Sequence, residues 1–271
     1  MQQKVHLVGA GPGDPELLTR KAWRILYEAD VILHDDLVSE AILRILPASA
    51  QVVNVGKRCG SKVISQSEIN ALMVQFSREG KKVARLKNGD PSLFGRAGEE
   101  MEALHHAGID VEVVPGVTSA LGAAASAGIS LTDRRHASQV LFVTAHREGG
   151  TGLCSEHNLG ADTTVVIYMP GHRYAELARE LQEAGIAAET PCLLISHATT
   201  EHETIYRTKV AALTECPETA SPSLLIVGEV AAAARDQEPA ARQLYGNLNA
   251  DLSETTGRLL FPDTSGRSSG E

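Results

Sequence analysis

The sequence predicts an α/β fold in two domains, and three observations lead to this. Short apolar runs alternate with helix-like segments through the first half, which indicates a mostly parallel sheet with helices on both faces. Pro115-Gly116 breaks that rhythm and predicts a hinge. The 271 residues suffice for two such domains. We therefore expect domains at 1–114 and 115–231, followed by a polar segment, 232–271, typical of a disordered tail.

The first half predicts five strands, at 5–8, 31–34, 51–55, 82–86 and 111–114. Asp14-Pro15 predicts the first helix start, because aspartate caps helices and proline suits their first turn. Apolar residues at 17, 18, 22, 25 and 26 give that helix one apolar face. Further helices are expected at about 39–46, after Ser65 or Ser67, and at 97–104.

The second half begins with a small, alanine-rich helix at 117–127. Strands are expected at 140–144, 164–168, 192–196, 204–207 and 224–227, with helices near 174–184 and 210–215. The stretch 148–160 indicates a loop.

Composition excludes several classes of protein. The net charge of −9 argues against general nucleic-acid binding. No apolar run approaches the roughly 20 residues that span a bilayer. The N-terminus enters a strand within four residues without a signal-like segment, so we expect a cytoplasmic protein. The four cysteines form no Cys-x-x-Cys pair, and no metal site is expected.

The stretch Lys87–Arg96 follows a predicted strand and precedes a predicted helix, where open α/β sheets bind ligands. Gly89 permits a close backbone approach, and Asp90 places a carboxylate there. Another glycine-rich loop, Gly9–Gly13, follows the first strand. Its Gly-x-Gly-x-Gly spacing is not that of dinucleotide sites, and no Gly-Lys-Ser/Thr follows, so a nicotinamide or ATP site is poorly supported.

Several pieces of sequence stand in a fixed order: GAGPGDPELLT, HDDLVS, VGKRCG with QSEIN, KNGDPSLFGRAGEE, VVPGVTSA, YMP, SHATT and LLIVGEV. Over about residues 4 to 231 this set resembles the tetrapyrrole methylases, and within them the members that methylate uroporphyrinogen III. The resemblance implies two α/β domains with S-adenosylmethionine (SAM) in the cleft between them, and a homodimer. It implies transfer of two methyl groups to give precorrin-2, a precursor of siroheme and cobalamin. Longer relatives carry an oxidase/chelatase domain in front, which we do not expect here.

The resemblance also assigns roles to residues of this chain. The SAM contacts it implies are Pro12, Asn88, Gly89, Asp90, Leu93, Thr118, Ser119, Met169 and Ala198. Asp35 would be the proton acceptor and Lys57 the proton donor, and Arg96 would belong to the substrate pocket. On its chemistry alone Lys57 could instead hold a substrate carboxylate, which is physically the simpler role. The family usually has glycine at position 88. Asparagine tolerates a positive φ, so the turn can keep its shape. The family's Tyr-Asp is His34-Asp35 in this chain.

A substrate with many carboxylates requires a cleft that is locally positive despite the net charge of −9. The candidate cations are Lys57, Arg58, Lys62, Arg96, Arg134, Arg135, His136, His146 and Arg147. Two alternatives stay open. One is a sister methylase that acts later on the cobalamin path, and the other is a non-catalytic module that binds SAM or a tetrapyrrole. A nicotinamide dehydrogenase is a distant third, since the glycine spacing is wrong.

Overall fold

The computed structural model describes residues 3–56, 64–146 and 159–234, which all fall within one compact unit, Met1–Arg235. Ten strands in this part of the chain form two separate five-stranded sheets, and the predicted α/β class is confirmed. The first sheet uses strands before Pro115-Gly116 and the second uses strands after it. The division into domains at 1–114 and 115–231 stays a prediction. The predicted tail lies outside the described residues from 235 on, as does most of the predicted loop at 148–160.

The first sheet is parallel throughout, in the order β3-β2-β4-β1-β5. Its strands are β1 (Val5–Gly9), β2 (Val31–His34), β3 (Gln51–Asn54), β4 (Val83–Lys87) and β5 (Val111–Val114). The carboxyl ends of parallel strands share one edge, so the loops that follow them gather there. Since β4 is the central strand, the turn that begins at Asn88 lies in the middle of this edge.

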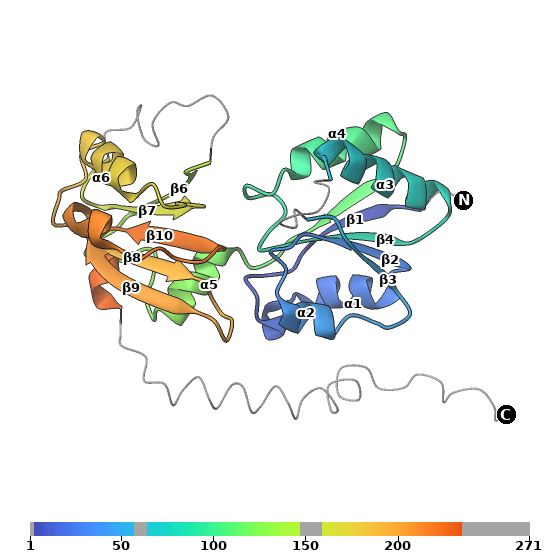
Figure 1. The fold of residues 1–271 in the computed structure, drawn as a ribbon, viewed down its shortest axis with the longest axis horizontal. Coiled ribbons are helices and arrows are strands. Elements are labelled where there is room, and N and C mark those ends of the chain that lie inside the picture. The colour runs from blue at the N-terminus through green and yellow to red at the C-terminus, as the bar shows by residue number, and fades with distance from the viewer. Residues whose placement is uncertain (1–2, 57–63, 147–158, 235–271) are drawn as a thin grey trace. The chain divides into compact units, whose positions relative to one another are not determined.

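Helices cover both faces of the first sheet (Figure 1). One face carries α1 (Arg20–Glu28) and α2 (Glu40–Arg44), and the other carries α3 (Gln66–Arg78) and α4 (Ala97–His106). Alternate strand residues therefore enter two different cores, as the period of two along a strand requires. Side chains of β4 at 83, 85 and 87 point toward α3 and α4, and those at 84 and 86 point the other way.

The first predicted helix divides in two. Asp14 caps only a short 3-10 helix, η1 (Pro15–Leu17), and α1 begins at Arg20. Thr19 is the cap of α1, since its hydroxyl accepts a hydrogen bond from the Ala22 amide at 3.1 Å. Asp14 and Pro15 thus begin a helix as predicted, but that helix ends at Leu17 and α1 starts separately at Arg20. The stretch Val210–Glu215 is also a 3-10 helix, η2.

The second sheet has the order β6-β7-β10-β8-β9, and only the β6–β7 pair is parallel. Its strands are β6 (Gln139–Thr144), β7 (Thr163–Tyr168), β8 (Pro191–Ser196), β9 (Thr204–Lys209) and β10 (Ser223–Val227). One face packs on α6 (Tyr174–Glu183) and η2, and the other on α5 (Ser119–Ser126). A last 3-10 helix, η3 (Glu229–Ala233), follows β10.

Three glycines, Gly9, Gly89 and Gly116, lie against one another where the chain leaves β1, β4 and β5, and we call this place the glycine crossing. A Cβ atom on Gly116 would lie 2.3 Å from the carbonyl oxygen of Gly89, and one on Gly9 would lie 2.5 Å from the Gly116 nitrogen. Gly11 and Gly89 also exchange backbone hydrogen bonds of 3.1 and 2.7 Å. At this crossing glycine is needed because one backbone approaches another. The close backbone approach predicted at Gly89 is therefore, in part, an approach to the protein's own backbone at Gly11 and Gly116.

Candidate active site

A pocket of about 620 Å³ lies beside the glycine crossing. The loops after β1, β2, β4 and β5 line one side of it, and residues after β7 and β8 and at the start of β10 line the other. Pockets for small molecules are usually about 300–1,000 Å³, so this one has room for a ligand of that class.

Every cofactor contact implied by the sequence lines this pocket: Pro12, Asn88, Gly89, Asp90, Leu93, Thr118, Ser119, Met169 and Ala198. Asp35 and Arg96 line it as well. Lys57 lies outside the described residues. The fold therefore brings residues from five separate stretches of sequence to one place, beside two of the three predicted catalytic side chains.

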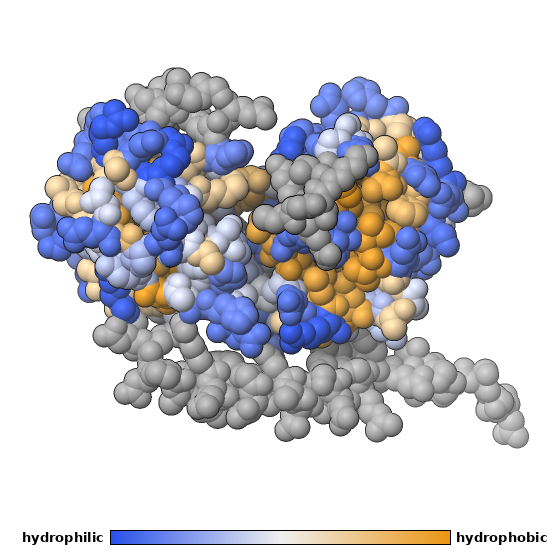
Figure 2. Space-filling model, in the orientation of Figure 1, coloured by the Kyte–Doolittle hydropathy of each residue, from blue (hydrophilic) through white to orange (hydrophobic). Residues whose placement is uncertain are grey.

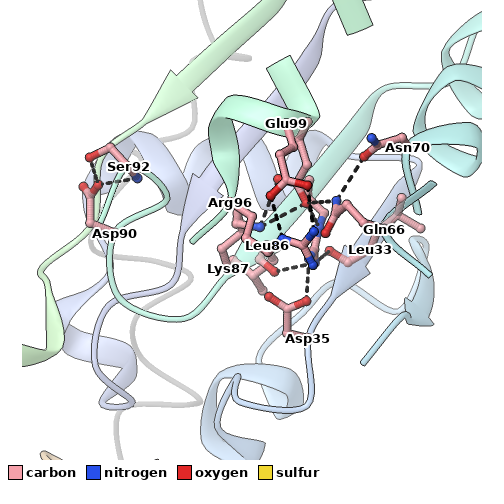
Figure 3. Close-up of polar contacts among 12 residues, drawn as sticks. Leu33, Asp35, Gln66, Asn70, Leu86, Lys87, Asp90, Ser92, Arg96 and Glu99 are labelled. Carbon is pink, nitrogen blue, oxygen red and sulfur yellow. Dashed lines mark hydrogen bonds and ion pairs between the residues drawn. The ribbon is translucent and has the colours of Figure 1, made fainter. Parts of the chain in front are cut away.

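Asp90 is already engaged within its own turn. Its Oδ1 accepts hydrogen bonds from the Ser92 amide at 2.8 Å and the Ser92 hydroxyl at 2.5 Å, and its Oδ2 accepts one from the Gly116 amide at 3.0 Å. Figure 3 shows Asp90 and Ser92 apart from the group around Lys87 and Asp35. Asp90 therefore ties the turn after β4 to the chain after β5, and shapes the pocket wall even without a ligand.

Asn88 does not need the left-handed conformation that we expected it to tolerate. Of the pair Asn88-Gly89 only Gly89 has a positive φ, of +66°. The Asn88 side-chain amide fits its hydrogen-bonding surroundings when its nitrogen donates to the carbonyl oxygens of Gly11, at 3.2 Å, and Leu37, at 3.3 Å. The side chain thus links the β4 turn to the loops after β1 and β2.

Tyr168, at the end of β7, links the two halves of the pocket wall. Its hydroxyl lies 2.5 Å from the Thr118 hydroxyl and accepts a hydrogen bond from the Ala120 amide at 3.3 Å. Its ring packs on Phe94, with centroids 5.0 Å apart. Burial raises the pKa of the Tyr168 hydroxyl, so it stays protonated at neutral pH. It holds the start of α5 where Thr118 and Ser119 face the pocket.

Backbone strain is concentrated around this pocket. Among the described residues, five that are not glycine have a positive φ, between 48° and 68°: Phe94, Arg96, Met169, His197 and Thr199. The first three line the pocket, and the last two flank Ala198, which also lines it. Such conformations cost about 1–3 kcal/mol each and cluster at functional sites. The strain independently marks the same place as the predicted contacts.

Buried charges lie behind Asp35. Arg85 and Lys87 point from β4 toward α4, where both bind Glu100: Arg85 Nε and Lys87 Nζ each donate to its Oε1 at 3.0 Å. Arg85 also forms an ion pair with Asp35. Burial lowers the pKa of Lys87, with Arg85 adding to the effect. Burial also opposes the charge on Arg85, but Asp35 and Glu100 outweigh it and raise the pKa of Arg85.

Sequence reasoning missed Arg85, Lys87 and Glu100, although a signal was present. Two basic residues stand two apart in a strand that is otherwise apolar, so both must point to the same buried face. A buried charge requires a partner, which predicts an acidic residue on the covering helix. Glu100 meets that requirement, and its side chain is fully buried.

Few of the predicted cations reach the pocket. Arg96 lines it, but its guanidinium holds the Glu99 carboxylate through two bonds of 2.7 Å. Arg135 pairs instead with Asp133 at 2.8 Å and does not line the pocket, and neither do Arg134, His136 and His146. Lys57, Arg58, Lys62 and Arg147 lie outside the described residues. The basic side chains of the described lining are therefore Arg85, Lys87 and Arg96.

Metal-binding groups are not found where the chain is described: no cluster of three or more His, Cys, Asp or Glu side chains occurs there. Cys192 and Cys216 are free thiols, and Cys59 and Cys154 lie outside the described residues. No helix in the described ranges is long and apolar enough to cross a membrane.

The two-sheet fold matches that of solved methyltransferases. A family profile for tetrapyrrole (corrin/porphyrin) methylases matches residues 4–214, and the chain belongs to that family. It is 46% identical over 239 residues to uroporphyrinogen-III C-methyltransferase of Paracoccus denitrificans, covering 86% of this chain and 83% of the relative.

Two further similarities agree with this. Siroheme synthase of Actinobacillus pleuropneumoniae is 44% identical over 235 residues, covering 86% of this chain and 48% of the relative. This chain therefore spans about half the length of that relative. Uroporphyrin-III C-methyltransferase of Thermus thermophilus, solved in complex with S-adenosylhomocysteine, matches with a TM-score of 0.73 and 39% identity, over 88% of this chain and 97% of the other.

Proposed function

We propose that this chain is a SAM-dependent C-methyltransferase that adds two methyl groups to uroporphyrinogen III and gives precorrin-2. The observation that carries the proposal is the single pocket lined by all nine implied cofactor contacts together with Asp35 and Arg96. The 46% identity to the Paracoccus enzyme, over most of both chains, supports the same substrate.

The residues present fit SAM. The pocket of about 620 Å³ is within the range of small-molecule sites, and its wall combines apolar Leu93 and Met169 with polar Thr118, Ser119 and Asp90. Met169 has a left-handed backbone, Ala198 lies between two residues that do, and both line the pocket. When bound, SAM supplies the methyl group from its sulfonium.

The main role of the protein in this reaction is to align the reacting groups. A carbon nucleophile, a methyl group and sulfur must lie in line, and positioning can supply much of the barrier reduction. The glycine crossing and the Asn88 and Asp90 contacts hold the β4 turn, while Tyr168 holds the start of α5. The two walls of the pocket are thus fixed before any ligand arrives.

After methyl transfer the pyrrole ring carries positive charge until it loses a proton. Asp35, at the end of β2, is the proposed proton acceptor, and as an anion it also stabilises that charge. Lys57 is the proposed proton donor. Arg96 is the proposed partner of a substrate carboxylate. To bind the substrate, its guanidinium must release the Glu99 carboxylate that it holds in this structure.

Two alternatives remain. A sister methylase on the cobalamin path would share the fold and the cofactor, but the GKR loop and QSEIN favour the uroporphyrinogen enzyme. A non-catalytic binding module was suggested only by Asn88 and His34. The Asn88 amide can donate to the Gly11 and Leu37 carbonyl oxygens, and His34 is buried with its Nδ1 3.0 Å from the Asp35 carbonyl oxygen. Neither residue argues against turnover.

The test is incubation of the purified chain with SAM and uroporphyrinogen III under anaerobic conditions. We expect S-adenosylhomocysteine and a product carrying two added methyl groups, by mass spectrometry. SAM binding without turnover would support the binding module instead. Turnover only with a later, already methylated tetrapyrrole would support the sister enzyme.

A homodimer and a cytoplasmic location belong to the same proposal. Figure 2 shows a hydrophobic area on the part built from the first sheet, and exposed large hydrophobic residues include Val52 on edge strand β3. Apolar surface of this kind often marks an interface. Sedimentation at several protein concentrations would show whether two chains associate. The end product of the pathway, siroheme or cobalamin, depends on the enzymes that consume precorrin-2.

A further inference from the structure

Asp35 is held by one side chain from the central strand. Arg85 pairs with Leu33 in the register of β2 and β4, so it lies one step below the loop that carries Asp35. The Asp35 Oδ1 atom accepts a hydrogen bond from Arg85. Its Oδ2 atom has no hydrogen-bond partner among the described residues, and the side chain, 29% exposed, lines the pocket. Arg85 thus holds one carboxylate oxygen, and the side chain that carries the other lines the pocket.

Arg85 is itself fixed from every side. Its Nη1 donates to the carbonyl oxygens of Leu86 at 3.2 Å and Leu33 at 3.4 Å, and its Nε donates to Glu100 at 3.0 Å. Its side chain is 2% exposed. Glu100 is held in turn by Lys87 and by the Gln66 amide, at 3.0 and 3.3 Å. Such a guanidinium has no freedom to move away from Asp35.

The charges around Asp35 balance. Arg85 and Lys87 come from β4 and Glu100 from α4, so with Asp35 the group holds two cations and two carboxylates. On its own segment Asp35 is flanked by His34 and by Asp36, whose carboxylate accepts a hydrogen bond from the Asn54 amide at 2.7 Å. Figure 3 shows Asp35, Lys87 and Gln66 around this group of buried charges.

We propose that Arg85 and Glu100 are positioning residues for methyl transfer: Glu100 fixes Arg85, and Arg85 aims the Asp35 carboxylate at the charge that develops on the pyrrole ring. This rests on the proposed function, which gives Asp35 its role. A preorganised anion is effective because it needs no rearrangement when the charge appears. A carboxylate that rotated freely would lose that advantage.

The test is a double-mutant cycle between Arg85→Lys and Asp35→Asn. Lysine keeps the positive charge but lacks the planar fork that reaches Asp35, Glu100 and two carbonyl groups at once. We expect Arg85→Lys to lower kcat by roughly 10- to 100-fold, since small misplacements have effects of that size. The Michaelis constant for uroporphyrinogen III and the SAM dissociation constant should stay nearly unchanged. With Asp35→Asn already present, Arg85→Lys should lower kcat by no more than about twofold further, because Arg85 then has no Asp35 carboxylate to position. If the two residues acted independently, their separate losses in kcat would multiply.

Ser77→Ala is the matched control for lost stability. Ser77 is buried on α3, away from the pocket, and its hydroxyl donates to the Gln3 carbonyl oxygen at 2.6 Å. Its loss should lower the melting temperature and leave kcat intact. Should Arg85→Lys fail to fold, Glu100→Gln takes its place in the cycle, with a smaller loss confined to kcat.

Several outcomes would overturn the proposal. They are unchanged kcat in a folded Arg85→Lys or Glu100→Gln variant, losses that multiply fully with Asp35→Asn, or a loss confined to SAM binding. If the wild type is active and the kcat losses of the two variants multiply fully, only the positioning role is contradicted and the proposed function stands. A wild type that binds SAM but never methylates uroporphyrinogen III would remove the proposed function, and this inference with it.

Discussion

Asp90 and Asp35 are both carboxylates of the pocket, but they are held in different ways. Asp90 spends both oxygens on the Ser92 and Gly116 contacts, whereas Asp35 is fastened by one oxygen only. We therefore expect loss of Asp90 to change the shape of the turn that includes Asn88 and Gly89, and loss of Asp35 to leave that turn in place.

We predict that Asp90→Ala weakens SAM binding more than Asp35→Ala does. Hydrogen bonds to a charged group are worth about 1.5–3 kcal/mol, which corresponds to roughly 10- to 150-fold in the dissociation constant for Asp90→Ala. Asp35→Ala should change that constant by less than about threefold. Calorimetric titration of both variants measures this. Equal effects would mean that the two carboxylates have been assigned wrongly.

Arg96 combines a strained backbone with a charged side chain at the pocket. We predict that Arg96→Ala lowers catalytic efficiency with uroporphyrinogen III by roughly 10- to 100-fold, if the clamp contributes 1.5–3 kcal/mol. SAM affinity should be nearly unchanged, and Arg96→Lys should recover only part of the loss because lysine lacks the planar fork.

Two controls make the Arg96 result specific. Glu99→Gln removes the carboxylate that holds the guanidinium in the free protein, and should not lower efficiency. Arg96→Gly removes the side chain without the strain of φ +57°, and should match Arg96→Ala in kinetics. Unchanged efficiency in the alanine variant, or a loss limited to SAM binding, would refute the clamp.

The residues of the pocket were predictable because they stand in ordered motifs beside strand ends, and all nine implied cofactor contacts do line one pocket. What each residue touches was less predictable. Asn88 was expected to fit the turn because asparagine tolerates a positive φ, but its φ is not positive, and its amide bridges two other loops. The Arg85–Glu100 pair depends on which face of α4 meets β4, and single-strand patterns do not contain that.

At the scale of elements, the glycine crossing makes the loops after β1, β4 and β5 one unit. We predict that Gly116→Ala lowers the free energy of unfolding by about 1–3 kcal/mol or more, since its Cβ would lie 2.3 Å from the Gly89 carbonyl oxygen. SAM binding should weaken with it, because the β4 turn must shift. Denaturant unfolding and calorimetry measure the two effects.

Gly98 provides the matched control. It lies inside α4, and a Cβ there would meet nothing within 4 Å. Gly98→Ala should raise the free energy of unfolding by about 0.5–1 kcal/mol, through its better helix propensity. If the two alanine variants change stability in the same direction, steric crowding at the crossing is not the explanation.

Local patterns predicted all ten described strands but not the arrangement of the second sheet. Alternation of strands and helices requires crossover connections, which is why the parallel first sheet followed from the sequence. In the second half the pairing of β10 between β7 and β8 joins segments distant in the chain. No periodicity within a strand encodes such a partner. The break before α1 was missed for a different reason: the sequence pattern ran one helix on from Asp14-Pro15, whereas Thr19 caps a second helix that starts at Arg20.

For the whole molecule, we predict that SAM binding requires no metal ion. The implied contacts are backbone groups and hydroxyl, amide and carboxylate side chains, with no ligand cluster in the described ranges. Titration of protein treated with a chelator should give the same dissociation constant as untreated protein. Loss of binding after chelation, with recovery on adding a divalent ion, would contradict this.

The five left-handed residues around the pocket also have a consequence for engineering. A selection for heat resistance alone would favour glycine at Phe94, Arg96, Met169, His197 and Thr199, because glycine adopts those angles without steric cost. The same changes would erase pocket-lining side chains at 94, 96 and 169 and loosen the loop around Ala198. Thermostable descendants of this chain chosen without an activity screen should therefore accumulate their losses at this pocket, and a screen for both properties should find its stabilising changes elsewhere.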